Sequence, residues 1–189
     1  MRLLRNRLVA AVALACAVGV TPAAAQTSQL FATGSNVFVR FVGHTASFTS
    51  DLFWCTASTS ASCGQYLFTN HTSAPGSIVQ VANTFSIGQE VIFGLFVRNT
   101  GHWFFSGPGW RNPDGLIHFL ANNTSDPTWP VRGGFEDLLG GGDLDYDDLV
   151  FDFRGVSPNV VVPEPTTVVL FGTGLAAIGL VARRRRRES

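Results

Sequence analysis

The C-terminal end of the chain carries an apolar segment that indicates a membrane span and not part of a folded core. Residues 166–182 are 17 positions without a charged side chain. The five residues that follow are Arg183, Arg184, Arg185, Arg186 and Arg187. A helix needs at least about 17 apolar residues to cross the hydrocarbon layer of a bilayer. Because arginines beside a span stay on the cytoplasmic side, we expect the preceding chain to lie across the membrane.

A short motif stands directly before this segment, and its residues are Val162, Pro163, Glu164 and Pro165. The motif, the short apolar span and the terminal arginine cluster together resemble the PEP-CTERM sorting signal of Gram-negative bacteria. This resemblance implies cleavage by an exosortase, a membrane-embedded cysteine protease that releases or re-anchors the exported body. Residues 158–189 then form a stalk and a sorting tail, and an uncut membrane anchor is the alternative.

The N-terminal end indicates export as well. Three arginines among the first seven residues precede an apolar run over residues 8–20, and alanines at 23–25 supply the small residues that signal peptidase requires. We therefore predict a signal peptide over residues 1–25 and a mature chain that begins at Gln26. A lipoprotein site at Cys16 is the alternative, but the residues before it make a poor lipobox.

Between these two ends lies an acidic domain from Gln26 to Val162. It contains five arginines, no lysine and eleven carboxylates, which gives a net charge of −6. Such a domain has no basic surface for the phosphates that dominate affinity for DNA and RNA, so nucleic acid is excluded as a partner. Its 137 residues are enough for one domain with a single core.

Two cysteines, Cys55 and Cys63, remain in the exported body. In an oxidising compartment this pair predicts one disulfide that closes the loop 56–62. A reactive or metal-binding pair of thiols is the alternative, although the pair lacks CxxC spacing and a neighbouring histidine.

Apolar residues in the body alternate with a period of two, which predicts strands and not helices. Val37, Val39 and Phe41, for example, share one face of the first expected strand. The expected strands cover residues 37–42, 47–54, 65–68, 77–85, 90–98, 103–105, 116–120 and 149–153. Short strands separated by turn residues indicate an all-β fold, namely an antiparallel β-sandwich of the jelly-roll kind over residues 26–157. The 16 phenylalanines are expected to fill the space between its two sheets.

One segment of the body combines a glycine run at 140–142 with closely spaced carboxylates. The glycines permit a tight turn, and the alternate residues Asp143, Asp145 and Asp147 direct their oxygens to one side. Such clustering is repulsive unless a cation offsets it. Calcium accepts irregular loops of oxygen ligands and is the expected cation. Further candidate ligands are Glu136, Asp137 and Asp148.

The spacing of these aspartates matches only the opening of an EF-hand loop. Asp148 stands where an EF-hand has glycine, and Arg154 stands where it has glutamate. The segment is therefore no EF-hand. A solvated turn, in which the aspartates cap backbone amides, is the alternative to a metal site.

The same segment is similar to a second family. Gly-Phe-Glu-Asp-Leu at 134–138 and Asp-x-Asp-Tyr-Asp-Asp-Leu-Val-Phe at 143–151 follow Asn-Pro-Asp-Gly at 112–115 and His118. This order resembles the C-terminal signature of DUF4114, an uncharacterised domain of exported bacterial proteins. The resemblance implies a β-rich extracellular module that is associated with calcium and has no established activity.

The sequence offers little support for an enzyme. It has no Gly-x-Ser-x-Gly motif, its four histidines show neither HxH nor HExxH spacing, and the adjacent Glu136 and Asp137 do not establish a glycosidase pair. We expect no catalytic activity.

A binding module is a stronger alternative than an enzyme. Several aromatic residues lie near glycine or proline, among them Trp103, Phe104, Phe105, Trp110 and Trp129. Most are expected in the core, whereas Trp110, between Gly109 and Arg111, is the candidate for an exposed ring that stacks on a sugar.

These features together predict an exported, non-enzymatic protein of the cell surface or extracellular matrix, associated with exopolysaccharide and stabilised by calcium. The alternative is a carbohydrate-binding module or adhesin. Expected partners are signal peptidase and an exosortase during processing, the inner membrane before cleavage, and exopolysaccharide afterwards.

Overall fold

The computed structural model describes residues 27–159. The predicted signal peptide, the motif at 162–165, the apolar segment 166–182 and the arginines at 183–187 lie outside the described residues. Within 27–159, no helix has the length and hydropathy that a membrane crossing requires.

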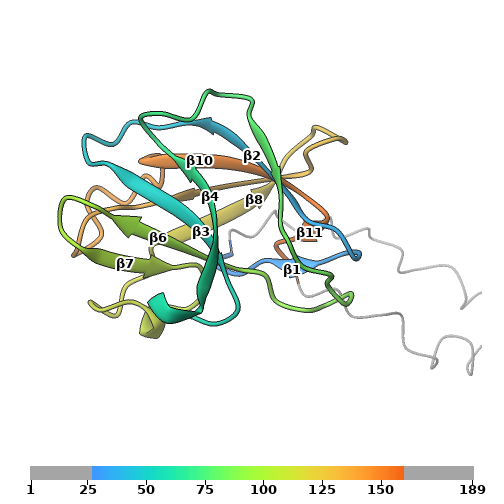
Figure 1. Ribbon diagram of the computed structural model, residues 1–189, viewed down its shortest axis with the longest axis horizontal. Coiled ribbons are helices and arrows are strands. Elements are labelled where there is room, and N and C mark those ends of the chain that lie inside the picture. The colour runs from blue at the N-terminus through green and yellow to red at the C-terminus, as the bar shows by residue number, and fades with distance from the viewer. Residues whose placement is uncertain (1–26, 160–189) are drawn as a thin grey trace, which may run out of the picture.

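Two antiparallel sheets pack against each other (Figure 1). One sheet has the strand order β5-β2-β10-β9-β8, the other has the order β4-β3-β6-β7, and the short strands β1 and β11 pair at one end. The strands are β1 (Phe31–Ala32), β2 (Phe38–Gly43), β3 (Ser50–Cys55), β4 (Cys63–Thr69), β5 (Ile78–Gln80), β6 (Ile92–Val97), β7 (His102–Phe105), β8 (Phe119–Asn123), β9 (Val131–Phe135), β10 (Leu149–Arg154) and β11 (Val156–Ser157). Two 3₁₀ turns, η1 (Ser60–Ser62) and η2 (Gly109–Arg111), are the only helical segments among the described residues. The predicted all-β antiparallel sandwich is confirmed.

Phenylalanine rings from both sheets fill the interior. Phe93 of β6 and Phe153 of β10 lie with ring centroids 5.1 Å apart, and Phe41 of β2 lies 5.7 Å from Phe151. The fully buried rings are Phe41, Phe93, Phe104, Phe119, Phe135, Phe151 and Phe153. Large rings suit this space because facing sheets stand about 10 Å apart.

Strand β9 lies outside the expected strands, and its third and fourth residues are glycines. A Cβ at Gly133 would lie 2.5 Å from Cζ of Phe119, so the ring on β8 occupies the place of a side chain. On the other face, a Cβ at Gly134 would collide with the backbone carbonyl of Tyr146. Glycine weakens a strand but permits another backbone to approach closely. The loop that follows β9 can therefore fold back onto the sheet.

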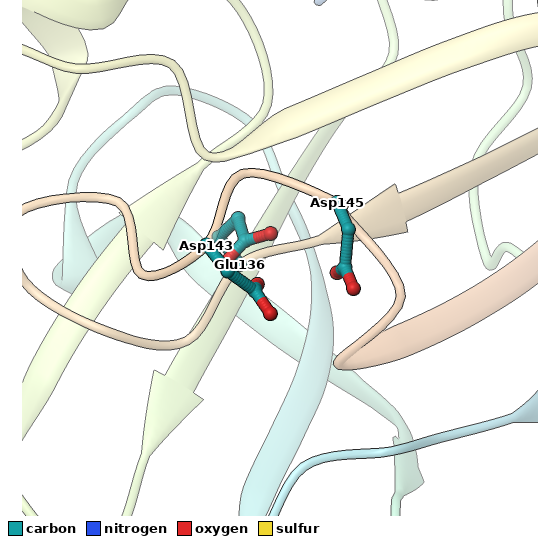
Figure 2. Close-up of side chains that lie close together, drawn as sticks. All are labelled: Glu136, Asp143 and Asp145. Carbon is teal, nitrogen blue, oxygen red and sulfur yellow. The ribbon is translucent and has the colours of Figure 1, made fainter.

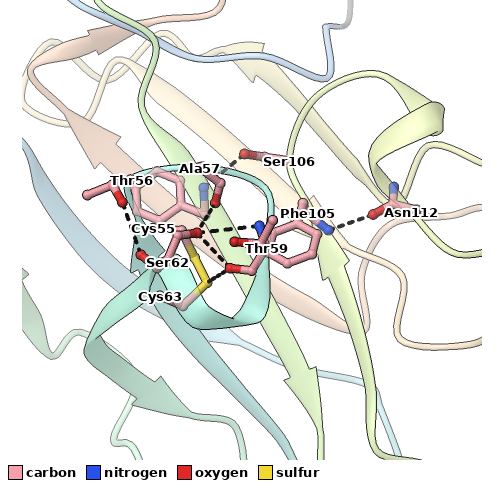
Figure 3. Close-up of a disulfide and its surroundings, with 10 residues drawn as sticks. Cys55, Thr56, Ala57, Thr59, Ser62, Cys63, Phe105, Ser106 and Asn112 are labelled. Carbon is pink, nitrogen blue, oxygen red and sulfur yellow. Dashed lines mark hydrogen bonds between the residues drawn. A yellow bond between two sulfur atoms is a disulfide. The ribbon is translucent and has the colours of Figure 1, made fainter.

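The cysteines join the end of β3 to the start of β4 (Figure 3). Cys55 and Cys63 are opposite each other in the strand register and form a disulfide with Cα atoms 3.9 Å apart. The bond lies over Gly94 of β6, where a Cβ would stand 2.8 Å from Sγ of Cys55. The exposed loop between the cysteines is held by a hydrogen bond of 3.0 Å from the Thr56 amide to the Ser62 carbonyl.

Candidate metal centre

The loop between β9 and β10, residues 136–148, forms the acidic site. Its backbone is left-handed at the three glycines and also at Leu144, with φ of 62°, and at Tyr146, with φ of 58°. Residues with a side chain rarely adopt positive φ, and such strain persists only where the surroundings hold it. The glycine turn expected from the sequence thus extends through two residues that carry bulky side chains.

Contacts with the sheet and with a neighbouring loop hold this conformation. The Tyr146 carbonyl packs over Gly134, the Tyr146 amide donates to Oε1 of Glu136 at 2.6 Å, and the Tyr146 hydroxyl donates to the Ile117 carbonyl at 3.2 Å. The carbonyl of Asp147 accepts a hydrogen bond of 3.2 Å from the Thr45 amide. Tyr146 is therefore the main anchor of the loop.

Three carboxylates converge inside this anchored loop (Figure 2). Glu136, Asp143 and Asp145 each place an oxygen within 4.8 Å of the others. The two aspartates are exposed, whereas Glu136 has only 1% of its surface exposed. The donors are all oxygens, which suits a hard cation such as calcium better than zinc, for which nitrogen and sulfur ligands are usual.

One oxygen of Glu136 has no partner. Oε2 is buried and accepts no hydrogen bond within the described residues, while Oε1 is taken by Tyr146. A Cβ at Gly142 would lie 2.6 Å from Oε2, so the glycine leaves this oxygen room towards the loop. An unpaired buried oxygen costs free energy, which a bound cation would offset.

The electrostatics of the site disfavour its negative charges. Burial, together with the charges of Asp148, Asp143 and Asp145, raises the pKa of Glu136 to about 7, although the Tyr146 amide acts in the opposite direction. Burial and the charge of Asp148 raise the pKa of Asp137 to about 6. A cation would reverse this effect because an adjacent positive charge favours the ionised carboxylate.

The other three predicted ligands serve as anchors. Asp147 accepts a hydrogen bond from the Thr45 hydroxyl, Oδ2 of Asp137 accepts one of 3.1 Å from the Ser50 hydroxyl, and Oδ2 of Asp148 accepts one of 3.0 Å from the Asp137 amide. The structure thus brings together Glu136, Asp143 and Asp145, although Oδ1 of Asp145 also accepts a hydrogen bond of 3.1 Å from the Asp147 amide. The carboxylates of Asp137, Asp147 and Asp148 are directed to protein donors.

A buried histidine beneath the loop was not among the predicted metal ligands. His118 is fully buried and lies flat on Phe104, with ring centroids 3.8 Å apart. Its Nε2 lies 2.9 Å from Oδ2 of Asp114, and its Nδ1 lies 3.0 Å from the Glu136 carbonyl. Asp114 in turn accepts a hydrogen bond of 2.8 Å from the Gly140 amide. His118 and Asp114 therefore connect the first part of the acidic loop, at Glu136 and Gly140, to the 112–118 segment.

The charge of Asp114 is well stabilised. Burial alone would raise its pKa, but hydrogen bonds from the Gly140 and Leu116 amides and from His118 lower it to about 2. Both ring nitrogens of His118 face oxygen atoms, namely Oδ2 of Asp114 and the Glu136 carbonyl. The sequence signal for this pair was the Asn-Pro-Asp-Gly turn at 112–115 together with His118.

Trp110 is exposed, with 74% of its surface accessible on the turn η2. The guanidinium of Arg111 lies 5.4 Å from its ring centre and also donates to Glu90 at 2.8 Å. Phe104, Phe105 and Trp129 are buried. Of these aromatic residues, Trp110 is the one that can meet a flat partner without disturbing the core.

The described residues form a β-sandwich module with an acidic loop. Comparison with known families indicates how the protein is sorted. The PEP-CTERM protein-sorting motif matches residues 161–187. The motif implies a protein that is exported, processed by an exosortase and sorted through the membrane to the cell surface. The match covers the tail and leaves the body unassigned, so the resemblance of residues 135–151 to DUF4114 stays a prediction. Searches of curated proteins and of solved structures returned no match.

Proposed function

We propose that the exported body is a non-enzymatic module of the cell surface or the exopolysaccharide-rich matrix, stabilised by calcium in the β9–β10 loop. The unpartnered Oε2 of Glu136, buried beside the carboxylates of Asp143 and Asp145, carries this proposal. Calcium takes six to eight oxygens, so these three residues would leave positions for water or for an external ligand.

The surroundings of the site support a structural role and not a catalytic one. General acid–base catalysis needs a titrating group within reach of a substrate. His118 lies beneath the loop with both ring nitrogens engaged, and Asp137 is buried against Ser50. A cation at this position would instead fix the strained turn through Leu144 and Tyr146.

Thermal unfolding of the purified mature protein tests the calcium site. Free calcium at a hundredfold excess over Kd should raise the Tm by roughly 10 °C, because ligand binding to the folded state alone contributes about 2.7 kcal/mol. Glu136→Gln should abolish this shift. Asp126→Asn, at an exposed carboxylate of a different loop, is the matched control and should keep the shift. Equal melting curves of the wild-type protein with calcium and with chelator would refute the site.

A carbohydrate-binding module is the second candidate function, and the exposure of Trp110 favours it. An exposed indole ring offers a flat face for stacking on a sugar. Trp110→Ala should abolish retention on the matrix polysaccharide of the host while the melting temperature stays unchanged. A glycan array with and without calcium separates the two functions, since a lectin shows saturable sugar binding and a matrix protein shows self-association or a change in stability.

A further inference from the structure

Exposed apolar side chains gather around the acidic loop. Among the described residues, nine large hydrophobic side chains are exposed, and six of them belong to two neighbouring loops. We call these six the apolar rim: Trp110, Leu116, Ile117, Leu138, Leu139 and Leu144, with exposures between 37% and 74%. Single exposed apolar residues need no explanation, but a cluster of this kind marks an interaction surface.

Close contacts at glycines link four residues of the rim. Leu116 and Leu144 both lie against Gly141, at 3.4 and 2.8 Å from the position of a Cβ there. Leu138 lies against Gly142, whose Cβ position is also 2.6 Å from Oε2 of Glu136. The turn that carries Trp110 begins at Gly109, which packs on the backbone of Gly115 and Leu116. Leu116, Leu138 and Leu144 of the rim therefore adjoin the glycine turn beside the candidate metal centre.

The rim lies at one end of the sandwich. In Figure 1 the loops before β8 and between β9 and β10 lie at the end away from β1 and β11. Loop ends project from a sandwich, so leucines there can enter another phase without disturbing the sheets. Aliphatic side chains do not stack on sugars, whereas a bilayer accepts them, and an indole ring favours the boundary between lipid and water.

The charge of the candidate metal centre determines which lipid headgroups the apolar rim can approach. Without a cation, the carboxylates of Glu136, Asp143 and Asp145 repel anionic headgroups. A bound calcium ion would offset two of these three negative charges, and its open coordination positions would accept phosphate oxygens. The apolar rim and the metal centre would then act on one target, with the side chains in the acyl region and the ion at the phosphates.

We propose that the apolar rim docks onto a membrane surface rich in anionic phospholipid when calcium occupies the β9–β10 loop. The inference rests on the calcium site of the proposed function and adds its partner. A protein that is sorted through a membrane meets such a surface on its route.

Sedimentation of the exported body, cut before the sorting tail at residues 158–189, with phospholipid vesicles tests the proposal. The protein should pellet with vesicles that contain roughly a third phosphatidylglycerol in millimolar calcium, and stay in solution with chelator or with pure phosphatidylcholine. The double variant Trp110→Ser with Leu139→Ser should lose about tenfold or more in vesicle affinity while it keeps the calcium-induced rise in Tm. Ile87→Ser removes an exposed apolar side chain outside the rim and should bind like the wild type.

The outcomes separate this inference from the function on which it rests. If calcium raises the Tm but the protein never pellets with vesicles, membrane docking is refuted and the calcium site stands. If calcium changes neither the Tm nor the binding to vesicles, both the calcium site and membrane docking are refuted. Calcium-dependent dimers without vesicle binding would show that a second copy covers the rim, and equal binding in chelator would refute the role of the cation.

Discussion

The amide of Tyr146 donates a hydrogen bond of 2.6 Å to Oε1 of Glu136. This bond holds the glutamate under the loop and leaves Oε2 beside Asp143 and Asp145. One loop residue thus orients a candidate ligand ten positions earlier in the chain.

Glu136→Gln is expected to change stability in opposite directions with and without calcium. The amide oxygen can still accept from Tyr146, but the variant lacks the charge that Asp143 and Asp145 repel. In chelator the free energy of unfolding should rise by about 1 kcal/mol, whereas in calcium the variant should be less stable than the wild type. Denaturant titrations under both conditions measure the two differences, and a variant that loses stability in both would contradict the expectation.

Gly134→Ala should destabilise the protein by about 2–4 kcal/mol, because the new methyl group would collide with the Tyr146 carbonyl. The loop must lift from β9, so calcium should also bind more weakly. Gly64→Ala is the matched control, since that strand residue is exposed and has no atom within 4 Å of its Cβ position. Urea unfolding and calcium titration of both variants measure the effects, and similar results for the two would argue against the close approach.

The sequence predicted the sandwich because the alternation of apolar residues is a local property of each strand. It failed at β9, where glycine is required by Phe119 and by the Tyr146 carbonyl. Phe119 and Tyr146 are distant in the sequence, and no local pattern shows that they meet these glycines.

The candidate site was predictable in composition but not in geometry. The interpretation of Asp143, Asp145 and Asp147 as one set assumed an extended backbone. Positive φ at Leu144 and Tyr146 breaks that assumption, and Asp147 contacts Thr45 instead. The role of His118 likewise depends on an acceptor 18 residues away, which spacing alone does not reveal.

Protonation of Asp152 should lower the stability of the protein in acid. It lies in the middle of β10 with 1% of its surface exposed, and it accepts hydrogen bonds from Arg40 at 3.2 Å and from Arg132 at 2.8 Å. Burial alone would raise its pKa, but the two guanidinium groups outweigh burial and lower it.

A carboxyl group whose pKa is lower in the folded state stabilises the fold above its unfolded pKa of about 3.9. That contribution is lost as the pH falls through the folded value. Asp152→Asn should therefore cost about 2 kcal/mol at neutral pH, and the cost should shrink below about pH 3. Urea unfolding from pH 7 to pH 2 measures this, and Asp126→Asn, which removes an exposed carboxylate 3.9 Å from the same Arg40, shows how much of the effect depends on burial. A loss of stability in Asp152→Asn that is the same at every pH would contradict the lowered pKa of Asp152.

The disulfide should stabilise the protein moderately, because it closes a short loop with a sequence separation of 8. Chain entropy predicts a loss of about 2–3 kcal/mol for Cys63→Ser. Reduction of the wild-type protein should give a similar loss, while calcium binding at the opposite sheet should remain. Non-reducing mass spectrometry of the exported protein checks the bond itself, and two free thiols would exclude it.

His118→Phe tests whether the buried histidine positions the metal centre. Phenylalanine can retain the stacking on Phe104, but it cannot bridge Asp114 and the Glu136 carbonyl. Loss of the bridge leaves the buried Glu136 carbonyl without its partner and removes one of the three hydrogen bonds of Asp114, so we expect a cost of about 2–3 kcal/mol. Calcium affinity should fall as well, although residue 118 touches no ion. Phe104→Leu is the matched control, because it disturbs the same stack and keeps both hydrogen bonds. Calorimetric titration of the two variants with calcium separates positioning from packing: if both lose affinity equally, the histidine acts only as part of the core.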